Sequence, residues 1–75
     1  MRALLEHMVK EIVDHPEEIR IEEVTEGQML RLQLFVHRED IGKVIGKQGR
    51  TAKAIRTILY ASPSSYKRVQ LDIME

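Results

Sequence analysis

Two glycines, Gly46 and Gly49, enclose Lys47 and Gln48 in the second half of this 75-residue chain. Glycine lets the backbone turn tightly and approach a ligand closely, because no Cβ stands in the way. The residues after Gly49 have a helical pattern, and the start of a helix offers free N–H groups and a positive dipole end to an anion. Lys47 adds a positive charge and Gln48 a hydrogen-bond donor. These residue types at this spacing predict a loop that grips phosphate groups.

Further cations surround this loop, since Lys43 precedes it and Arg50 and Lys53 follow it. The bare pattern G-x-x-G is common by chance, and a plain link between two helices with glycine as the C-cap is the structural alternative. An apolar turn at Val44 and Ile45 before the loop, and a basic amphipathic helix after it, make the pattern more specific. We therefore favour the phosphate-binding interpretation.

The residues before this stretch predict a helix from Arg2 to Asp14 and then a β-hairpin. The helix shows a broad apolar stripe, and Pro16 stops it. From about Glu18 to Thr25 the pattern approaches period two, but Val24 falls out of step, which predicts a bulge or an early strand end. After a turn at residues 26–28, a second strand is predicted by the alternation of Leu30, Leu32, Leu34 and Val36.

The residues around and after the loop predict two helices and a last strand. A short helix begins near Arg38, and a second runs from about Arg50 to Ala61. Its buried stripe is expected to consist of Ala52, Ile55, Ile58 and Leu59. The closing strand is predicted by the alternation of Val69, Leu71 and Ile73.

The predicted order is therefore α-β-β-α-α-β, an α+β fold in one domain that spans residues 1–75. Because a strand–helix–helix–strand crossover normally joins parallel neighbours, the third strand is expected parallel to the second, with the first antiparallel on its other side. This gives a three-stranded mixed sheet with all three helices on one face.

The run Val44 to Gly49 resembles the signature of KH domains, in which a GXXG loop clamps about four nucleotides of single-stranded nucleic acid. The longer run Gly42 to Thr57, in so short a chain, is similar to the small bacterial single-KH RNA-binding proteins of the KhpA type. This resemblance implies the type II KH fold and a base-contacting groove beside the loop that also uses exposed positions of the second strand. The candidate RNA-binding residues are Gly42, Lys43, Ile45, Gly46, Lys47, Gln48, Gly49, Arg50, Thr51 and Lys53.

The resemblance also implies partners and a cellular role. Proteins of this family are associated with homodimers, with a larger KH-containing RNA-binding partner, and with effects on cell-wall synthesis and cell length. We expect single-stranded RNA as the ligand and a role as an RNA chaperone or post-transcriptional regulator. A protein-interaction module that dimerises through Ile58, Leu59 and Tyr60, or a ribosome-assembly factor with little RNA affinity of its own, is the alternative. Replacing both loop glycines by aspartate is expected to abolish RNA binding and leave the fold intact.

Composition excludes other classes of function. The net charge is zero, but residues 1–37 carry four cations and eight anions, whereas residues 38–75 carry eight cations and four anions. This asymmetry predicts a basic face for a polyanion. There is no cysteine, and His7, His15 and His37 fall on separate elements at no ligand spacing, so we predict no enzyme, metal or cofactor. Without an apolar run of membrane-spanning length or a signal peptide, the chain is expected to be cytoplasmic.

Overall fold

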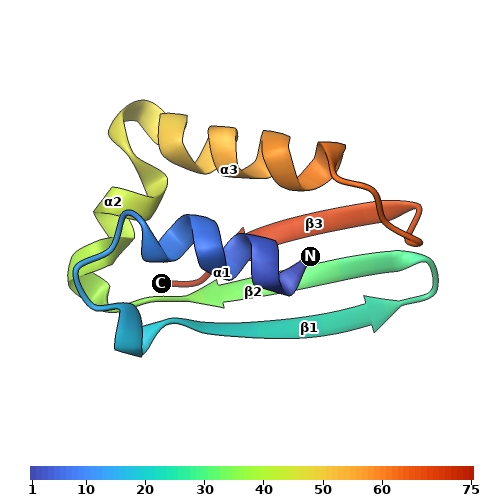
Figure 1. Cartoon of the computed structure of the whole chain (residues 1–75), viewed down its shortest axis with the longest axis horizontal. Helices are drawn as coiled ribbons and strands as arrows, with labels where there is room; N and C mark the ends of the chain where they lie inside the picture. Colours follow the sequence, from blue (N-terminus) through green and yellow to red (C-terminus); the bar gives the residue numbers. More distant parts are fainter.

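The computed structural model describes all residues, 1–75, and has the predicted α-β-β-α-α-β order (Figure 1). The sheet order is β1-β2-β3, with β1 antiparallel to β2 and β3 parallel to β2. The predicted mixed three-stranded sheet is thus confirmed. The helices and strands are α1 (Arg2–Lys10), β1 (Arg20–Glu26), β2 (Met29–Phe35), α2 (Ile41–Ile45), α3 (Arg50–Ala61) and β3 (Arg68–Ile73), with 3-10 turns at Pro16–Glu18, Arg38–Asp40 and Lys47–Gly49.

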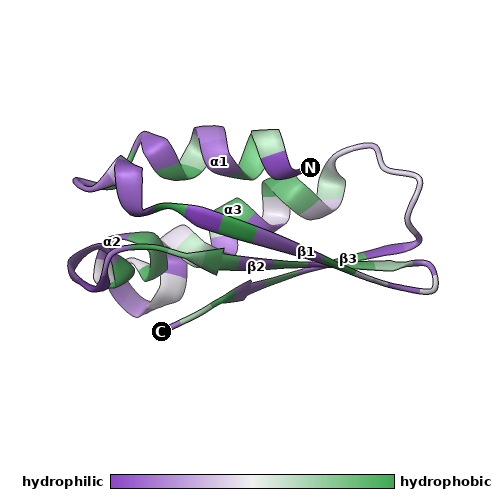
Figure 2. Ribbon diagram, turned by 90° about the horizontal axis from the view of Figure 1, so that it is seen from below, coloured by the Kyte–Doolittle hydropathy of each residue, from purple (hydrophilic) through white to green (hydrophobic).

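One hydrophobic core joins the helices to one face of the sheet. Alternate residues of β2 are buried, because successive side chains of a strand point to opposite faces of the sheet and one face meets the core. In Figure 1, α1 lies over the sheet and α3 runs alongside β3, and Figure 2 shows apolar and polar residues alternating along the strands. The core consists of Leu5, Val9, Ile21, Leu30, Leu32, Leu34, Val44, Ile55, Leu59 and Leu71.

The first helix is shorter than its apolar stripe predicts, because α1 ends at Lys10 and not at Asp14. The backbone N–H groups of Asp14 and His15 donate to the Asp40 carboxylate, at 3.1 and 2.9 Å. These hydrogen bonds to Asp40, which lies far along the chain, hold Asp14 and His15 in a non-helical conformation. Ile12 still packs against the core from the turn that follows α1.

The predicted bulge in the first strand is wrong. Strand β1 pairs with β2 residue by residue from Arg20 to Glu26, and Val24 lies opposite Arg31. The side chain of Val24 is 37% exposed, because it points to the face of the sheet that the helices leave open. Val24 therefore breaks the alternation of apolar and polar residues in the sequence, but the pairing of β1 with β2 continues through it.

Helix α3 buries a narrower stripe than expected. Ala52, Ile55 and Leu59 are buried, but the side chain of Ile58 is 49% exposed. The other partner of the helix is the edge of β3, where the Leu71 N–H donates to Tyr60 Oη at 3.2 Å and the Leu71 carbonyl accepts from Arg56 Nε at 3.4 Å. The helix thus covers the free backbone of an edge strand with polar side chains, and Ile58 stays outside.

Candidate nucleic-acid interface

Gly46 closes α2 and begins the loop in a conformation that only glycine accommodates. Its N–H donates to the Gly42 carbonyl at 2.8 Å, and its φ is +76°. A Cβ at Gly46 would lie 2.2 Å from Thr51 Oγ1 and 2.8 Å from Thr51 N. The loop therefore folds directly back on the first turn of α3, and any side chain at Gly46 would force the two apart.

The left-handed backbone continues on the far side of Lys47. Gln48 has φ +58° and is the one non-glycine residue with a positive φ, and Gly49 has φ +76°. A residue held in this region marks a position that the surrounding structure imposes, and such positions cluster at ligand sites. Gly49 is the N-cap of α3 and has no side chain that could cap the helix. The first backbone N–H groups of this 12-residue helix are therefore not covered by a capping side-chain oxygen.

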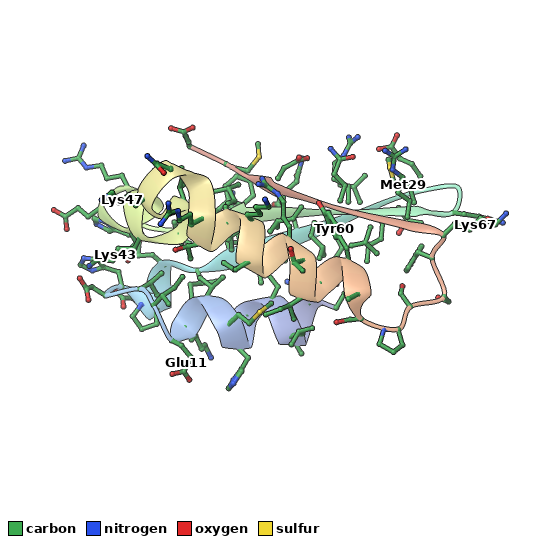
Figure 3. All side chains as sticks on the ribbon, turned by 90° about the horizontal axis from the view of Figure 1, so that it is seen from above. Glu11, Met29, Lys43, Lys47, Tyr60 and Lys67 are labelled. Atoms are coloured by element: carbon green, nitrogen blue, oxygen red, sulfur yellow. The ribbon has the colours of Figure 1, made fainter.

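Three exposed cations gather beside this backbone without carboxylate partners. Lys47, Arg50 and Lys53 are exposed and form no ion pair within the chain. Arg50 donates to Gln48 Oε1 at 3.3 Å, which links the loop to the helix. In Figure 3, Lys47 lies at one end of the molecule, while Met29 and Lys67 lie at the other. The charges at the loop end are therefore available to a polyanion.

Lys43 is placed near the loop as predicted, but its charge is already paired. Its ammonium group contacts the Asp14 carboxylate, and it lies 3.8 Å from Asp40 Oδ1. The hydrogen bond to Asp14 raises the pKa of Lys43 above 10.5, with further increase from the charges of Asp14, Asp40 and Glu39 against the opposing effect of desolvation. Lys43 therefore stays protonated but offers less free charge than Lys47.

A buried carboxylate, Asp40, supports α2 from behind. Burial acts to raise its pKa, but the two backbone N–H donors from Asp14 and His15, with the charges of His15 and Lys43, outweigh it and hold the pKa of Asp40 below 3.8. An ionised acceptor between two backbone donors fixes the connection after α1 against the start of α2. The base of the loop is positioned in this way.

The remaining predicted site residues frame a shallow surface around α2 and α3. Gly42 is exposed, whereas Ile45 and Thr51 are half-buried. Beside them, a depression of about 420 Å³ runs along α3 and is lined by Arg50, Lys53, Ala54, Thr57 and Ile58. The ten predicted residues thus lie together on the end of α2, the loop and the first turns of α3.

One expectation about the groove fails. The half-buried side chains of β2, Arg31, Gln33 and Phe35, point away from the helices, since the alternate positions face the core. They therefore lie on the face of the sheet opposite the core. Ala54 and Thr57, which the sequence analysis did not select, do line the depression, and their spacing of one helical turn from Arg50 and Lys53 is the signal that would have found them.

The element order, the parallel pairing of β2 with β3 and a G-x-x-G loop with positive φ at both glycines define the class of protein: a type II KH domain. A family model described as the KhpA/KhpB KH domain matches residues 2–73, and the chain belongs to this family. The predicted fold and family are confirmed.

Named relatives match over nearly their whole length. The chain is 50% identical to "RNA-binding protein KhpA" of Halalkalibacterium halodurans, over all of both chains. It is 53% identical to the protein of that name from Oceanobacillus iheyensis, with 99% of this chain and all of the relative covered, and 51% identical to that from Bacillus subtilis, with 100% and 94% covered. No solved structure matches.

The names of these relatives and of the family describe RNA binding and a KH domain and no catalytic activity, in agreement with the prediction that the chain is not an enzyme. The helices of the structure are all too short or too polar to span a membrane.

Proposed function

We propose that this chain binds single-stranded RNA by holding the sugar–phosphate backbone in the Gly46–Gly49 loop. The observation that carries the proposal is the left-handed backbone at Gly46, Gln48 and Gly49, which presents the start of α3 beside three unpaired cations. Phosphodiesters need donors and positive charge but no shaped pocket. The names of the relatives support RNA as the nucleic acid.

The residues around the loop have different roles in the proposed RNA contact. Lys47, Arg50 and Lys53 neutralise phosphates, and Gln48 donates a hydrogen bond. Gly42, Lys43, Gly46, Gly49, Ile45 and Thr51 line the path of the strand, with Lys43 contributing least charge because Asp14 already neutralises it. About four nucleotides fit one such site, so binding is expected to be weak and to show little sequence preference.

Weak single sites favour pairing with a second RNA-binding unit, because linked sites gain avidity. Ile58 and Tyr60 are 49% and 48% exposed on α3, and this surface supports a homodimer or a complex with a larger KH-containing RNA-binding protein. In this proposal residues 1–75 act as one domain in the cytoplasm, as an RNA chaperone or post-transcriptional regulator. The family resemblance extends the proposal to cell-wall homeostasis and cell length.

The test is a fluorescence-anisotropy titration of a short labelled single-stranded RNA at low and moderate salt. We compare wild type with the double variant Lys47→Asp/Gln48→Asp. The matched control is Lys10→Asp/Gln28→Asp, which makes the same chemical changes at two exposed positions outside the loop. Circular dichroism shows whether each protein folds.

The expected result is salt-sensitive binding by wild type and the control, with at least about tenfold weaker binding, equal to ~1.4 kcal/mol, in the loop variant. Equal losses in both double variants would show a non-specific charge effect and contradict the loop site. Absence of binding in wild type would favour the second candidate, a protein-interaction module or ribosome-assembly factor acting through Ile58 and Tyr60. Sedimentation of wild type against Ile58→Asp tests that surface directly.

A further inference from the structure

A second group of chemistry-bearing side chains lies away from the loop, where the connection after α1 meets the connection before α2. One ligand atom from each of His15, His37 and Glu39 lies within 4.8 Å of the others. His15 and Glu39 are 24 positions apart in the sequence. The sequence spacing predicted no metal site because the histidines fall on separate elements, but the fold brings two of them together.

The two imidazole rings and the carboxylate form a compact arrangement. The rings of His15 and His37 stack with centroids 4.0 Å apart and an interplanar angle of 22°. Glu39 Oε1 lies 3.2 Å from His15 Nε2 and 3.9 Å from His37 Nδ1. One carboxylate oxygen thus faces nitrogen atoms of both rings, and both histidines are partly exposed.

We propose that His15, His37 and Glu39 form a binding site for a divalent transition-metal ion of the Zn²⁺ type. Two imidazoles and a carboxylate are a common zinc ligand set, with water completing a tetrahedron. Bond lengths near 2.1 Å place the ligand atoms of such an ion roughly 3.4 Å apart. His15 Nε2 and Glu39 Oε1 are 3.2 Å apart, close to this separation. His37 Nδ1, 3.9 Å from the same oxygen, joins them only when the His37 ring rotates out of its stack on His15, because the lone pairs of two nearly parallel rings do not converge on one ion.

The neighbours of His15 orient it for this role. The Glu17 carboxylate lies 3.7 Å from His15 Nδ1, on the nitrogen that does not face Glu39. A carboxylate there favours the proton on Nδ1 and leaves the Nε2 lone pair for a metal, as in many zinc sites. The His15 N–H donates to the buried Asp40 at 2.9 Å, so the backbone that carries the ligand is fixed.

One existing hydrogen bond competes with the metal. His37 Nδ1 accepts the Glu39 backbone N–H at 3.0 Å. A metal ion at this nitrogen displaces that bond, and the exposed N–H turns to water. Because bound imidazoles must be unprotonated, acid weakens metal binding. The bound ion would tie the connection after α1 to the start of α2 and stabilise the folded state by mass action.

The test uses tag-free, chelator-stripped protein titrated with zinc chloride by isothermal titration calorimetry, with thermal unfolding followed by circular dichroism. Wild type is expected to bind one Zn²⁺ per chain and to unfold at a higher temperature with zinc. His15→Gln, His37→Gln and Glu39→Gln are each expected to bind at least about tenfold more weakly. The control is His7→Gln, on the exposed side of α1, which is expected to bind as wild type does.

Absence of zinc uptake by wild type would overturn the proposal, as would uptake that survives the ligand substitutions or falls equally in His7→Gln. Glu39 keeps the test decisive if a histidine variant unfolds, because its side chain is exposed and forms ion pairs only with these histidines. The loop variant Lys47→Asp/Gln48→Asp is expected to retain zinc binding. Failure of the metal site and failure of the RNA site are therefore separate results.

Discussion

Cations lie both at the loop end and, as Arg31, at the centre of the open face of the sheet, but only those at the loop end are free of carboxylate partners. On the open face, Arg31 lies 3.2 Å from Glu26 and 3.6 Å from Asp72, and opposite charges on neighbouring strands pair across the sheet. At the loop end, Lys47 and Lys53 have no carboxylate partner. Unpaired charge, and not the number of cations, therefore distinguishes the loop end from the centre of the sheet, and the proposed RNA site rests on this difference.

Lys43 lies at the boundary between these two situations. It belongs to the loop end by position but is paired with Asp14 in the same way as the cations of the sheet. The comparison therefore predicts graded contributions to RNA binding, which single substitutions can measure.

The largest expected effect comes from filling the space at Gly46. Gly46→Ala places a Cβ against Thr51 in a left-handed conformation, which is expected to cost on the order of 3 kcal/mol of unfolding free energy. Gly49→Ala has the same unfavourable φ but no atom within 4 Å of the new Cβ, and is expected to cost about 1 kcal/mol. Urea denaturation measures both.

This contrast replaces the expectation that aspartates at both glycines leave the fold intact. Equal stability of Gly46→Ala and Gly49→Ala would contradict the close approach of the loop to α3.

A second substitution gives a cation at the loop end a carboxylate partner, as Arg31 has on the sheet. Ala54→Glu introduces a carboxylate four residues after Arg50 on an exposed side of α3, where it pairs with the Arg50 guanidinium. RNA affinity at low salt is expected to fall about tenfold, or ~1.4 kcal/mol, with little change in stability. The control is Ala3→Glu, at an exposed position of α1; an equal loss there would show a long-range effect of net charge.

A third prediction concerns the carboxylate behind α2. The pKa of Asp40 is lower in the folded state than 3.8, so its contribution is present at neutral pH and is lost as pH falls through the folded-state pKa. Thermal unfolding should show a decline in stability below about pH 4. Asp40→Asn should lower Tm on the order of 5 °C at pH 7 and flatten this acid decline; an unchanged acid profile in the variant would assign it to other carboxylates.

The smallest effects separate the individual cations. Lys47→Gln and Lys53→Gln are each expected to reduce the slope of log affinity against log salt by ~0.7, the value for one phosphate contact on a single strand. Lys43→Gln should change the slope less, and Arg31→Gln should not change it. Anisotropy titrations at several salt concentrations measure these slopes; a full loss in Arg31→Gln would place RNA on the sheet and reverse the comparison.

Local patterns in the sequence determined most of the fold. The alternation of leucines in β2 and the stripe of α3 predicted both elements, and the bounds of α3 agree with the prediction at Arg50 and Ala61. The Gly46–Gly49 loop was also found from sequence, because its glycines and cations are neighbours in the chain. These signals depend on residues within one or two turns of each other.

Contacts between distant residues were decided by the tertiary structure alone. The early end of α1, the pairing of Lys43 with Asp14 and the cluster of His15, His37 and Glu39 each join segments more than 20 residues apart. Such contacts form because folding of the sheet and helices brings two connections together, and no local periodicity records them. The sequence by itself therefore determined where the Gly46–Gly49 loop lies, and the tertiary structure decided which of the charges around it are free.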